Sequence, residues 1–185
     1  MNSENRVKYQ EVHSASRVDR SARMMLLAVS LISSAHLLTL ATSSPAHSWL
    51  AWISLAPLFI AVRYLSPIRA AVSGAFWGCS LYLFSWYLNS QGFVGSTITP
   101  GFSNFLLLTI IPAAFVGFGS LYTRRFGFSP LALATGWIAV ELCLQSIGLK
   151  HSLLAADASY GPYLQVIANL LGYGFVAFLV AFTNA

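Results

Sequence analysis

The sequence predicts an all-α integral membrane protein, built as a bundle of about six transmembrane helices. Hydrophobic residues make up 57% of the 185 residues and charged residues only 8%, which lies outside the range of ordinary soluble domains. Mean hydropathy is +0.69. From Met24 onward, long apolar stretches lie between and around only seven charged side chains. These are Arg63, Arg69, Arg124, Arg125, Glu141, Lys150 and Asp157.

Six apolar stretches are long enough, or nearly long enough, to cross the hydrocarbon core, which takes about 20 residues in a helix. The second and the fifth are short. Together they predict one transmembrane domain, residues 24–185, that follows a basic polar segment, residues 1–23, on the cytoplasmic side. The predicted spans are residues 24–42, 48–64, 68–88, 104–122, 131–147 and 164–183.

The end of the first span allows two interpretations. Ser43-Ser44-Pro45 fits the tight turn of a helical hairpin, because proline stops a helix. A basic start, an apolar run and Ser44-Pro45-Ala46 are also similar to a signal peptide with its cleavage site. The length of the apolar run and the hydrophobic segment that follows at once favour the hairpin.

Positive charge gathers on one side of the predicted bundle. With a cytoplasmic N-terminus and six alternating spans, nine of the ten Lys and Arg residues lie on the cytoplasmic side, in agreement with the positive-inside rule. Residues 89–103 and 150–163 then form outer loops. Half of the basic residues lie in the first 23 positions, beside the membrane. The net charge of +5 therefore indicates contact with anionic phospholipid and does not indicate nucleic-acid binding.

Small residues four positions apart, and two prolines, predict how the spans pack. Small-xxx-small faces let helices approach closely in lipid, and packing within the bundle is favoured over dimerisation. Pro57 and Pro112 lie inside spans, where each is expected to kink the helix or to remove a backbone hydrogen bond. The small pairs are Gly74 and Gly78, Ala113 and Gly117, and Ala168 and Gly172.

Three residues are candidates for contact with lipid or substrate: Trp86, Tyr87 and Glu141. Trp86 and Tyr87 end the third span at the outer interface, where they form either an aromatic belt or a platform for lipid. Glu141 is the only acid inside a predicted span. At that depth it is either a functional group or the acceptor of a structural hydrogen bond between helices. Gln145, one turn further on, is a candidate donor to its carboxylate.

Cysteine and histidine form no metal or cofactor motif in the sequence. Cys79 and Cys143 both lie inside spans, where cysteine usually serves as a small apolar residue. The sequence has no Cys-x-x-Cys pair and no His/Cys cluster. We therefore expect neither a metal nor a cofactor.

Three stretches, taken in order, carry a family resemblance. Residues 49–58 form a Trp-rich approach to Ala-Pro-Leu, and residues 74–87 form a glycine-rich, aromatic helix that ends near a Trp. The third, residues 130–185, has a Trp, a Glu-Leu pair, an outer loop, and a helix with a central Gly and an Asn-Ala near its end. Over residues 40–185 the chain thereby resembles the N-terminal membrane domain of bacterial apolipoprotein N-acyltransferases. The residues that carry the resemblance in the third stretch are Trp137, Glu141, Leu142, Gly172, Asn184 and Ala185.

The resemblance implies a place in lipoprotein N-acylation at the bacterial inner membrane. In that family, a phospholipid gives an acyl chain to the diacylglyceryl cysteine of a lipoprotein, through a thioester on an enzyme cysteine. The family's Glu-Lys-Cys triad lies in a nitrilase-like domain after a seventh membrane helix, and Cys79 and Cys143 do not correspond to its nucleophile. The expectation is a truncated, multi-pass membrane domain, inactive alone and with no catalytic residue of its own. Its expected partners are phospholipid and either a lipoprotein or a separate nitrilase-like chain.

Departures from the family pattern keep other functions open. Leu144 stands where the family commonly has Arg, and Leu149-Lys150-His151-Ser152 replaces a Phe-Pro-Trp of its outer loop. One alternative is a non-enzymatic membrane protein that binds lipid or a partner in an envelope or conjugal-transfer assembly. A small transporter is a third, weakened because no second buried charge offers a relay to Glu141.

Overall fold

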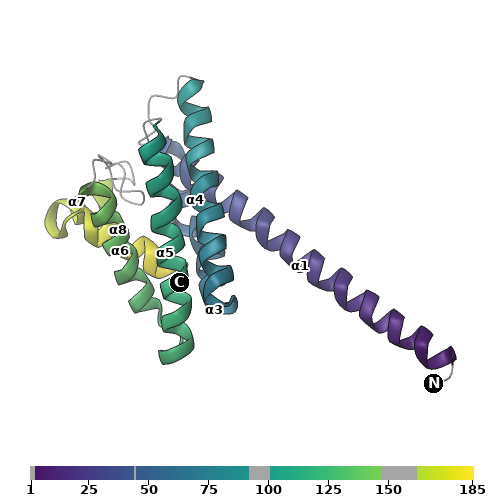
Figure 1. Ribbon diagram of the computed structural model, residues 1–185. Helices are drawn as coiled ribbons and strands as arrows, with labels where there is room; N and C mark the ends of the chain where they lie inside the picture. Colours follow the sequence, from purple (N-terminus) through teal and green to yellow (C-terminus); the bar gives the residue numbers. More distant parts are fainter. Residues whose placement is uncertain (1–2, 44, 92–100, 147–161) are drawn as a thin grey trace.

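The computed structural model describes residues 3–43, 45–91, 101–146 and 162–185, and within these ranges the fold contains helices and no strand (Figure 1). This confirms the predicted all-α class. In chain order the elements are α1 (Ser3–Ser43), the 3-10 helix η1 (Pro45–Leu50), α2 (Ala51–Ser54), α3 (Ala56–Tyr64), α4 (Pro67–Ser90), α5 (Phe102–Phe126), α6 (Pro130–Ser146), α7 (Pro162–Leu171) and α8 (Tyr173–Asn184).

The first helix is longer than the sequence indicates. The basic segment 1–23, expected to be separate, is from Ser3 onward continuous with the first span in α1. The N-terminal half of α1 projects away from the bundle (Figure 1). Its C-terminal half enters the core, where Leu31, Ala35 and Leu38 are buried at helical spacing.

The second predicted span is not one regular helix. After α1 ends at Ser43, the chain passes through η1, α2 and α3, with a break at Leu55 between the last two. Pro57 lies in the first turn of α3, and its nitrogen has no hydrogen to donate to the carbonyl four residues before it. The disturbance expected at Pro57 is therefore confirmed. The helix end expected around Pro45 is confirmed too, because η1 begins there.

Helices α4 and α5 run antiparallel and pack backbone to backbone through glycine. A Cβ built on Gly74 would lie 2.5 Å from the carbonyl oxygen of Pro112, and one on Gly78 would overlap with the carbonyl of Leu108. The Gly74–Gly78 pair therefore packs inside the bundle, as favoured from the sequence. Pro112 is tolerated, because α5 continues through it without a break.

The sixth predicted span, residues 164–183, is divided into two helices. Gly172 adopts a φ of +87° between α7 and α8, a conformation that favours glycine. The resulting helices have 10 and 12 residues, and at about 1.5 Å per residue neither crosses a core of about 30 Å. The single-helix prediction is therefore wrong. Ala168 and Gly172 were expected to form one small-residue face for close helix packing. Gly172 makes no such close contact, because no atom beyond its neighbours in the described chain lies within 4 Å of a Cβ built on it.

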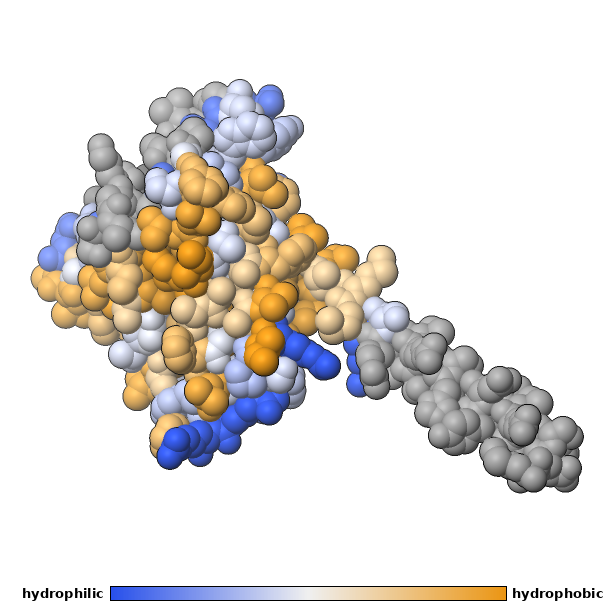
Figure 2. Space-filling model, in the orientation of Figure 1, coloured by the Kyte–Doolittle hydropathy of each residue, from blue (hydrophilic) through white to orange (hydrophobic). Residues whose placement is uncertain are grey.

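Within the part of the chain that the structure describes, three helical segments are long and apolar enough to cross a membrane, judged by length and composition: Ser21–Thr42, Ala46–Tyr64 and Phe102–Phe126. Two shorter apolar helices, Pro130–Gln145 and Tyr173–Asn184, accompany them. Figure 2 shows hydrophobic side chains over the sides of the bundle. These features belong to an all-α membrane protein. The count of six spans stays a prediction, and the end of the fifth, residue 147, lies outside the described residues.

One end of the bundle carries arginine. The hydroxyl of Ser120 on α5 donates to the carbonyl oxygen of Leu65 at 2.7 Å, which places the turn between α3 and α4 beside the last part of α5. The loops expected to share one side of the membrane therefore do meet at one end of the bundle, where Figure 2 shows hydrophilic surface. We call this the arginine end, after its residues Arg63, Arg69, Arg124 and Arg125.

Candidate functional site

Glu141 is buried on α6 and accepts a hydrogen bond from within its own helix. Its side chain is 3% exposed, and its Oε1 lies 3.0 Å from the indole Nε1 of Trp137, one turn earlier. Gln145, the donor expected from the sequence, is instead exposed. The spacing of four residues was informative, but the partner lies on the N-terminal side of the acid. An indole N–H in an apolar core needs an acceptor, and this carboxylate provides one.

Trp137 belongs to an aromatic cluster at the centre of the bundle. Its ring meets that of Trp77 edge to face at 6.0 Å between centroids, and that of Phe115 at 5.5 Å. Both tryptophans are fully buried. The cluster joins α4, α5 and α6 and fixes the ring that holds the acid.

A chain of hydrogen bonds leads from Trp77 to the break in the second span. The indole Nε1 of Trp77 donates to the hydroxyl of Ser34 on α1 at 2.8 Å. The Ser34 hydroxyl in turn donates to the carbonyl oxygen of Ser54. Ser34 and Ser54 are both completely buried. Because a buried carbonyl without a partner is costly, Ser34 stabilises the irregular backbone at the end of α2.

Asn184 completes the other side of this break. Its Oδ1 accepts hydrogen bonds from the backbone nitrogens of Leu55 and Ala56 at 2.9 and 3.0 Å. Its Nδ2 donates to the carbonyl of Ala51 at 3.1 Å and to that of Val180, on its own helix, at 2.7 Å. One amide on α8 thus serves both edges of the gap between α2 and α3. In the sequence, Asn184 is identified only as part of the family motif in the third stretch. The signal that backbone groups in the second predicted span needed a partner was Pro57, which lies in that span.

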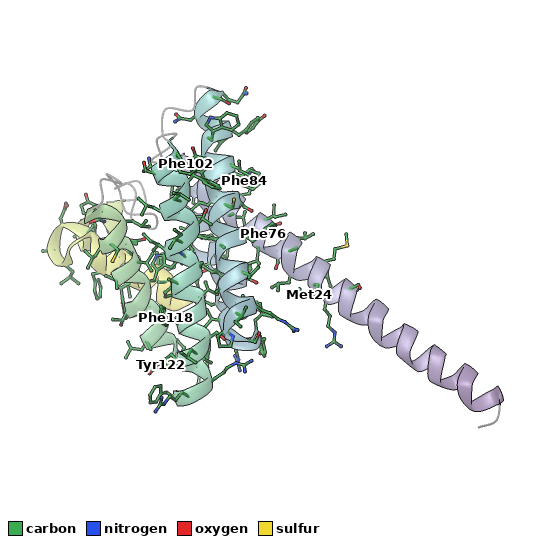
Figure 3. All side chains as sticks on the ribbon, viewed as in Figure 1. Met24, Phe76, Phe84, Phe102, Phe118 and Tyr122 are labelled. Atoms are coloured by element: carbon green, nitrogen blue, oxygen red, sulfur yellow. The ribbon has the colours of Figure 1, made fainter. Side chains whose placement is uncertain are left out.

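Trp86 and Tyr87 lie in different surroundings from Glu141. They are 52% and 56% exposed near the C-terminal end of α4. Figure 3 places Phe84 and Phe102 toward this end of the α4–α5 pair and Tyr122 toward the arginine end. We call Trp86 and Tyr87 the exposed aromatic pair. Its exposure fits both an aromatic belt and a lipid platform, and the structure separates it from the buried acid.

Tyr82 fixes the same end of the bundle. Its hydroxyl oxygen accepts a hydrogen bond from the backbone N–H of Gly101 at 3.0 Å, and its ring meets that of Phe105 at 5.3 Å between centroids. The start of α5 is thereby held against α4, two turns or less from the exposed aromatic pair. The pair therefore projects from a part of α4 that is packed against the start of α5.

The two cysteines lie on different helices. Cys79 is half-buried on α4, and Cys143 is exposed on α6. Within the described ranges, no three His, Cys, Asp or Glu side chains gather as metal ligands do. The outer loop with Lys150 and Asp157 lies outside the described residues. The described geometry thus provides a buried polar core and an exposed aromatic end.

In a comparison with known families, residues 34–185 match the apolipoprotein N-acyltransferase N-terminal domain. The matched part begins at Ser34 and includes Asn184, so it contains the whole buried polar network described above. No curated protein and no solved structure matches the chain.

Proposed function

Because the chain belongs to the apolipoprotein N-acyltransferase N-terminal domain family, we propose that it is the membrane domain of a protein that serves lipoprotein N-acylation. Its role is to receive a phospholipid acyl donor at the end of the bundle that carries the exposed aromatic pair. The acyl transfer itself belongs to a nitrilase-like domain, on the same chain or on a partner. We further propose that the arginine end faces the cytoplasm and that the membrane is the bacterial inner membrane.

The observation that carries this proposal is the combination of exposed rings with a fixed helix. Trp86 and Tyr87 have amphipathic rings, which favour the level where hydrocarbon meets headgroups. They lie on α4, which Gly74 and Gly78 pack tightly against α5 and which Trp77 joins to α1. A lipid that rests on these rings is therefore held at a fixed depth relative to the bundle.

Photocrosslinking tests this role directly. The purified chain, in vesicles that contain a phospholipid with a diazirine on its acyl chain, should capture lipid on residues 83–90. Unlabelled phospholipid should compete for this capture, because a site saturates and general contact with the bilayer does not. The double substitution Trp86→Ala/Tyr87→Ala should abolish the saturable part. Tyr122→Ala, which removes an exposed ring at the arginine end, should leave it unchanged.

Two outcomes would contradict the proposal. Labelling that unlabelled lipid does not reduce would leave the exposed aromatic pair as an interfacial belt only. Saturable labelling that survives in the double variant would place the lipid elsewhere. A pull-down in mild detergent with a nitrilase-like chain from the same cell tests whether the catalytic part is a separate partner.

A further inference from the structure

Phe118 projects from α5 between two apolar grooves, on a part of the bundle that the proposed function does not use. Its side chain is 72% exposed, and it lines both grooves. The walls of both come from α4, α5 and α6 alone. We call them the α4–α5 groove and the α5–α6 groove, and their volumes are about 430 and 260 Å³.

The α4–α5 groove is lined only by apolar residues and is about as long as one leaflet is deep. Along α5 it extends from Ile110 to Leu121, which is about 17 Å at a rise of about 1.5 Å per residue. One half of the hydrocarbon core of a bilayer measures about 15 Å. Close packing closes the floor of the groove, because a Cβ built on Gly117 would lie 3.0 Å from the Cβ of Ala71. The groove therefore has the length of an acyl chain in one leaflet.

The α5–α6 groove lies on the other side of Phe118. Along α5 it extends from Phe115 to Tyr122, about 10 Å, and Tyr122 carries the only hydroxyl among its lining side chains. Figure 3 shows Phe118 and Tyr122 along the same side of α5. Two apolar grooves on either side of one exposed ring match the two acyl chains of a phospholipid. The α6 wall of this groove is formed by Ala132, Leu133 and Gly136.

Two exposed arginines continue the grooved face of α5 to the arginine end. Arg124 lies seven residues after Gly117, which lines the α4–α5 groove. Arg125 lies seven residues after Phe118, which lines both grooves. Because seven residues are nearly two full turns of a helix, each arginine starts from nearly the same face as the residue before it. The two guanidinium groups are therefore placed about 10 Å further along α5 than the ring of Phe118, at the same side of the bundle.

The positive charge of these arginines is available to a ligand. Among the described residues after Met24, Glu141 is the only acid, and it is buried against the indole of Trp137. The other described acids belong to the N-terminal half of α1, which projects away from the bundle (Figure 1). The Cζ of Arg125 lies 5.7 Å from the ring centroid of Phe126, a cation–π contact that leaves its N–H donors available. Guanidinium groups with open donors suit a phosphate, which each can bind with two parallel hydrogen bonds.

We propose that Phe118 and its two grooves bind one anionic phospholipid from the leaflet at the arginine end. Its phosphate lies on Arg124 and Arg125, and its two acyl chains pass on either side of Phe118. Lipid tails are as apolar as the grooves, so close packing positions the chains without selecting the lipid. The headgroup makes the selection, because the ammonium of a zwitterionic head is repelled by the guanidinium groups. This site lies at the opposite end of the bundle from the exposed aromatic pair and does not depend on the role proposed for that pair.

Lipid binding by the purified chain tests the headgroup contact. Native mass spectrometry in mild detergent should show preferential retention of phosphatidylglycerol over phosphatidylcholine with the same acyl chains. Arg125→Gln should weaken phosphatidylglycerol binding about tenfold, the effect of losing a charge-assisted hydrogen bond. Arg63→Gln removes the same charge at the same end, but its guanidinium is held by the rings of Tyr64 and Phe128, away from both grooves. It should retain wild-type binding, and thermal unfolding of each variant checks that it is folded.

Three further arms test the placement of the chains. Ala114→Trp should fill the α4–α5 groove and reduce binding, whereas Val29→Trp, on exposed surface of α1, should not. Lysophosphatidylglycerol, which has the same head and one chain, should bind more weakly because one groove stays unfilled. Glycerol phosphate, which has no chain, should compete poorly.

Four results would overturn the proposal. Equal losses in Arg125→Gln and Arg63→Gln, or no loss in either, would leave only general attraction to a basic surface. Binding that Ala114→Trp leaves intact would place the lipid outside the α4–α5 groove. Lysophosphatidylglycerol that binds as tightly as the two-chain lipid would remove the pairing of chains and grooves. Glycerol phosphate that competes as well as the lipid would make this a site for phosphate alone.

Discussion

The side-chain oxygen of Asn184 lies 2.9 Å from the backbone nitrogen of Leu55, which is 129 residues earlier in the chain. The amide nitrogen of the same side chain donates to Ala51, whose carbonyl a regular helix would pair with the N–H of Leu55. Asn184 is therefore inserted into the backbone ladder of another helix, and it joins the last helix of the described chain to the second predicted span.

Removal of this amide should destabilise the bundle. Asn184→Leu keeps most of the volume but leaves the nitrogens of Leu55 and Ala56 without their acceptor. We expect a loss of about 2 kcal/mol or more in the free energy of unfolding, because unpaired buried backbone groups keep their full desolvation cost. Chemical unfolding in detergent measures this loss. Thr183→Val, whose hydroxyl bonds only within its own helix, should change stability by less than about 0.5 kcal/mol; equal effects would deny Asn184 its bridging role.

The Trp137–Glu141 pair should show energetic coupling. Trp137→Phe removes the indole donor, and Glu141→Leu removes its acceptor. We expect the two changes together to cost about 1 kcal/mol less than the sum of the single changes, because each single change removes the same hydrogen bond and Glu141→Leu alone leaves the buried indole N–H of Trp137 without this acceptor. A double-mutant cycle on unfolding measures this difference. As a control, Trp137→Phe is combined with Ser120→Ala, which removes a hydroxyl that bonds to Leu65. The losses in unfolding free energy should be additive for this pair, and a similar coupling energy would show that the substitutions loosen the whole bundle.

Two glycines should respond in opposite ways to the same change. Gly78→Ala places a methyl group against the carbonyl of Leu108 and should destabilise the protein by about 1–3 kcal/mol. Gly174 lies in α8, and no described atom outside its neighbours lies within 4 Å of a Cβ there. Gly174→Ala should therefore be neutral or stabilising by up to about 1 kcal/mol, from helix propensity. Thermal unfolding compares the two, and a tolerated Gly78→Ala would show that α4 and α5 pack less closely.

The arginine end should face the cytoplasm. In a background with Cys79 and Cys143 replaced by Ala, Ser66→Cys places a thiol beside the turn between α3 and α4, and Gln91→Cys places one at the other end of α4. A membrane-impermeant maleimide added to intact cells should label Gln91→Cys only, because the positive-inside rule places arginine in the cytoplasm. Labelling of Ser66→Cys from outside would reverse the topology.

The 185-residue chain should form no acyl-enzyme. After incubation with phospholipid, intact mass and peptide mapping should find no hydroxylamine-sensitive acyl group on Cys79 or Cys143. Acyl transfer through a thioester requires an activated thiolate, and neither cysteine corresponds to the nucleophile that the family resemblance implies. An acyl thioester on either residue would assign catalysis to the membrane domain itself.

Much of the fold could be predicted from composition and local chemistry. The apolar runs gave the positions of α4 and α5 to within a few residues, and Pro57 correctly indicated a disturbed second span. The break at Gly172 was missed, because a glycine within an apolar run has the appearance of a packing residue. Its positive φ depends on how α7 and α8 are placed, which the local sequence does not display.

The site was predicted less completely, because its contacts join distant parts of the chain. The burial of Glu141 was expected from its isolation among apolar residues. The hydrogen bond from Trp137 was not expected, because positions 137 and 145 both lie one helical turn from Glu141. The packing of Trp137 on Trp77 decides which of these two side chains reaches the carboxylate. The role of Asn184 depends on a backbone gap far away in sequence, so no local pattern indicates it.

The bridge from Asn184 to the second span also sets an order of events during synthesis. Ribosomes add about 5–20 residues each second, so the 129 residues between Leu55 and Asn184 take roughly 6–26 s to make. Throughout that interval the nascent second span has a gap whose native partner does not yet exist. The hydrogen bonds that close this gap form only when Asn184 reaches the membrane, so the second span takes its final structure after the later helices have been made.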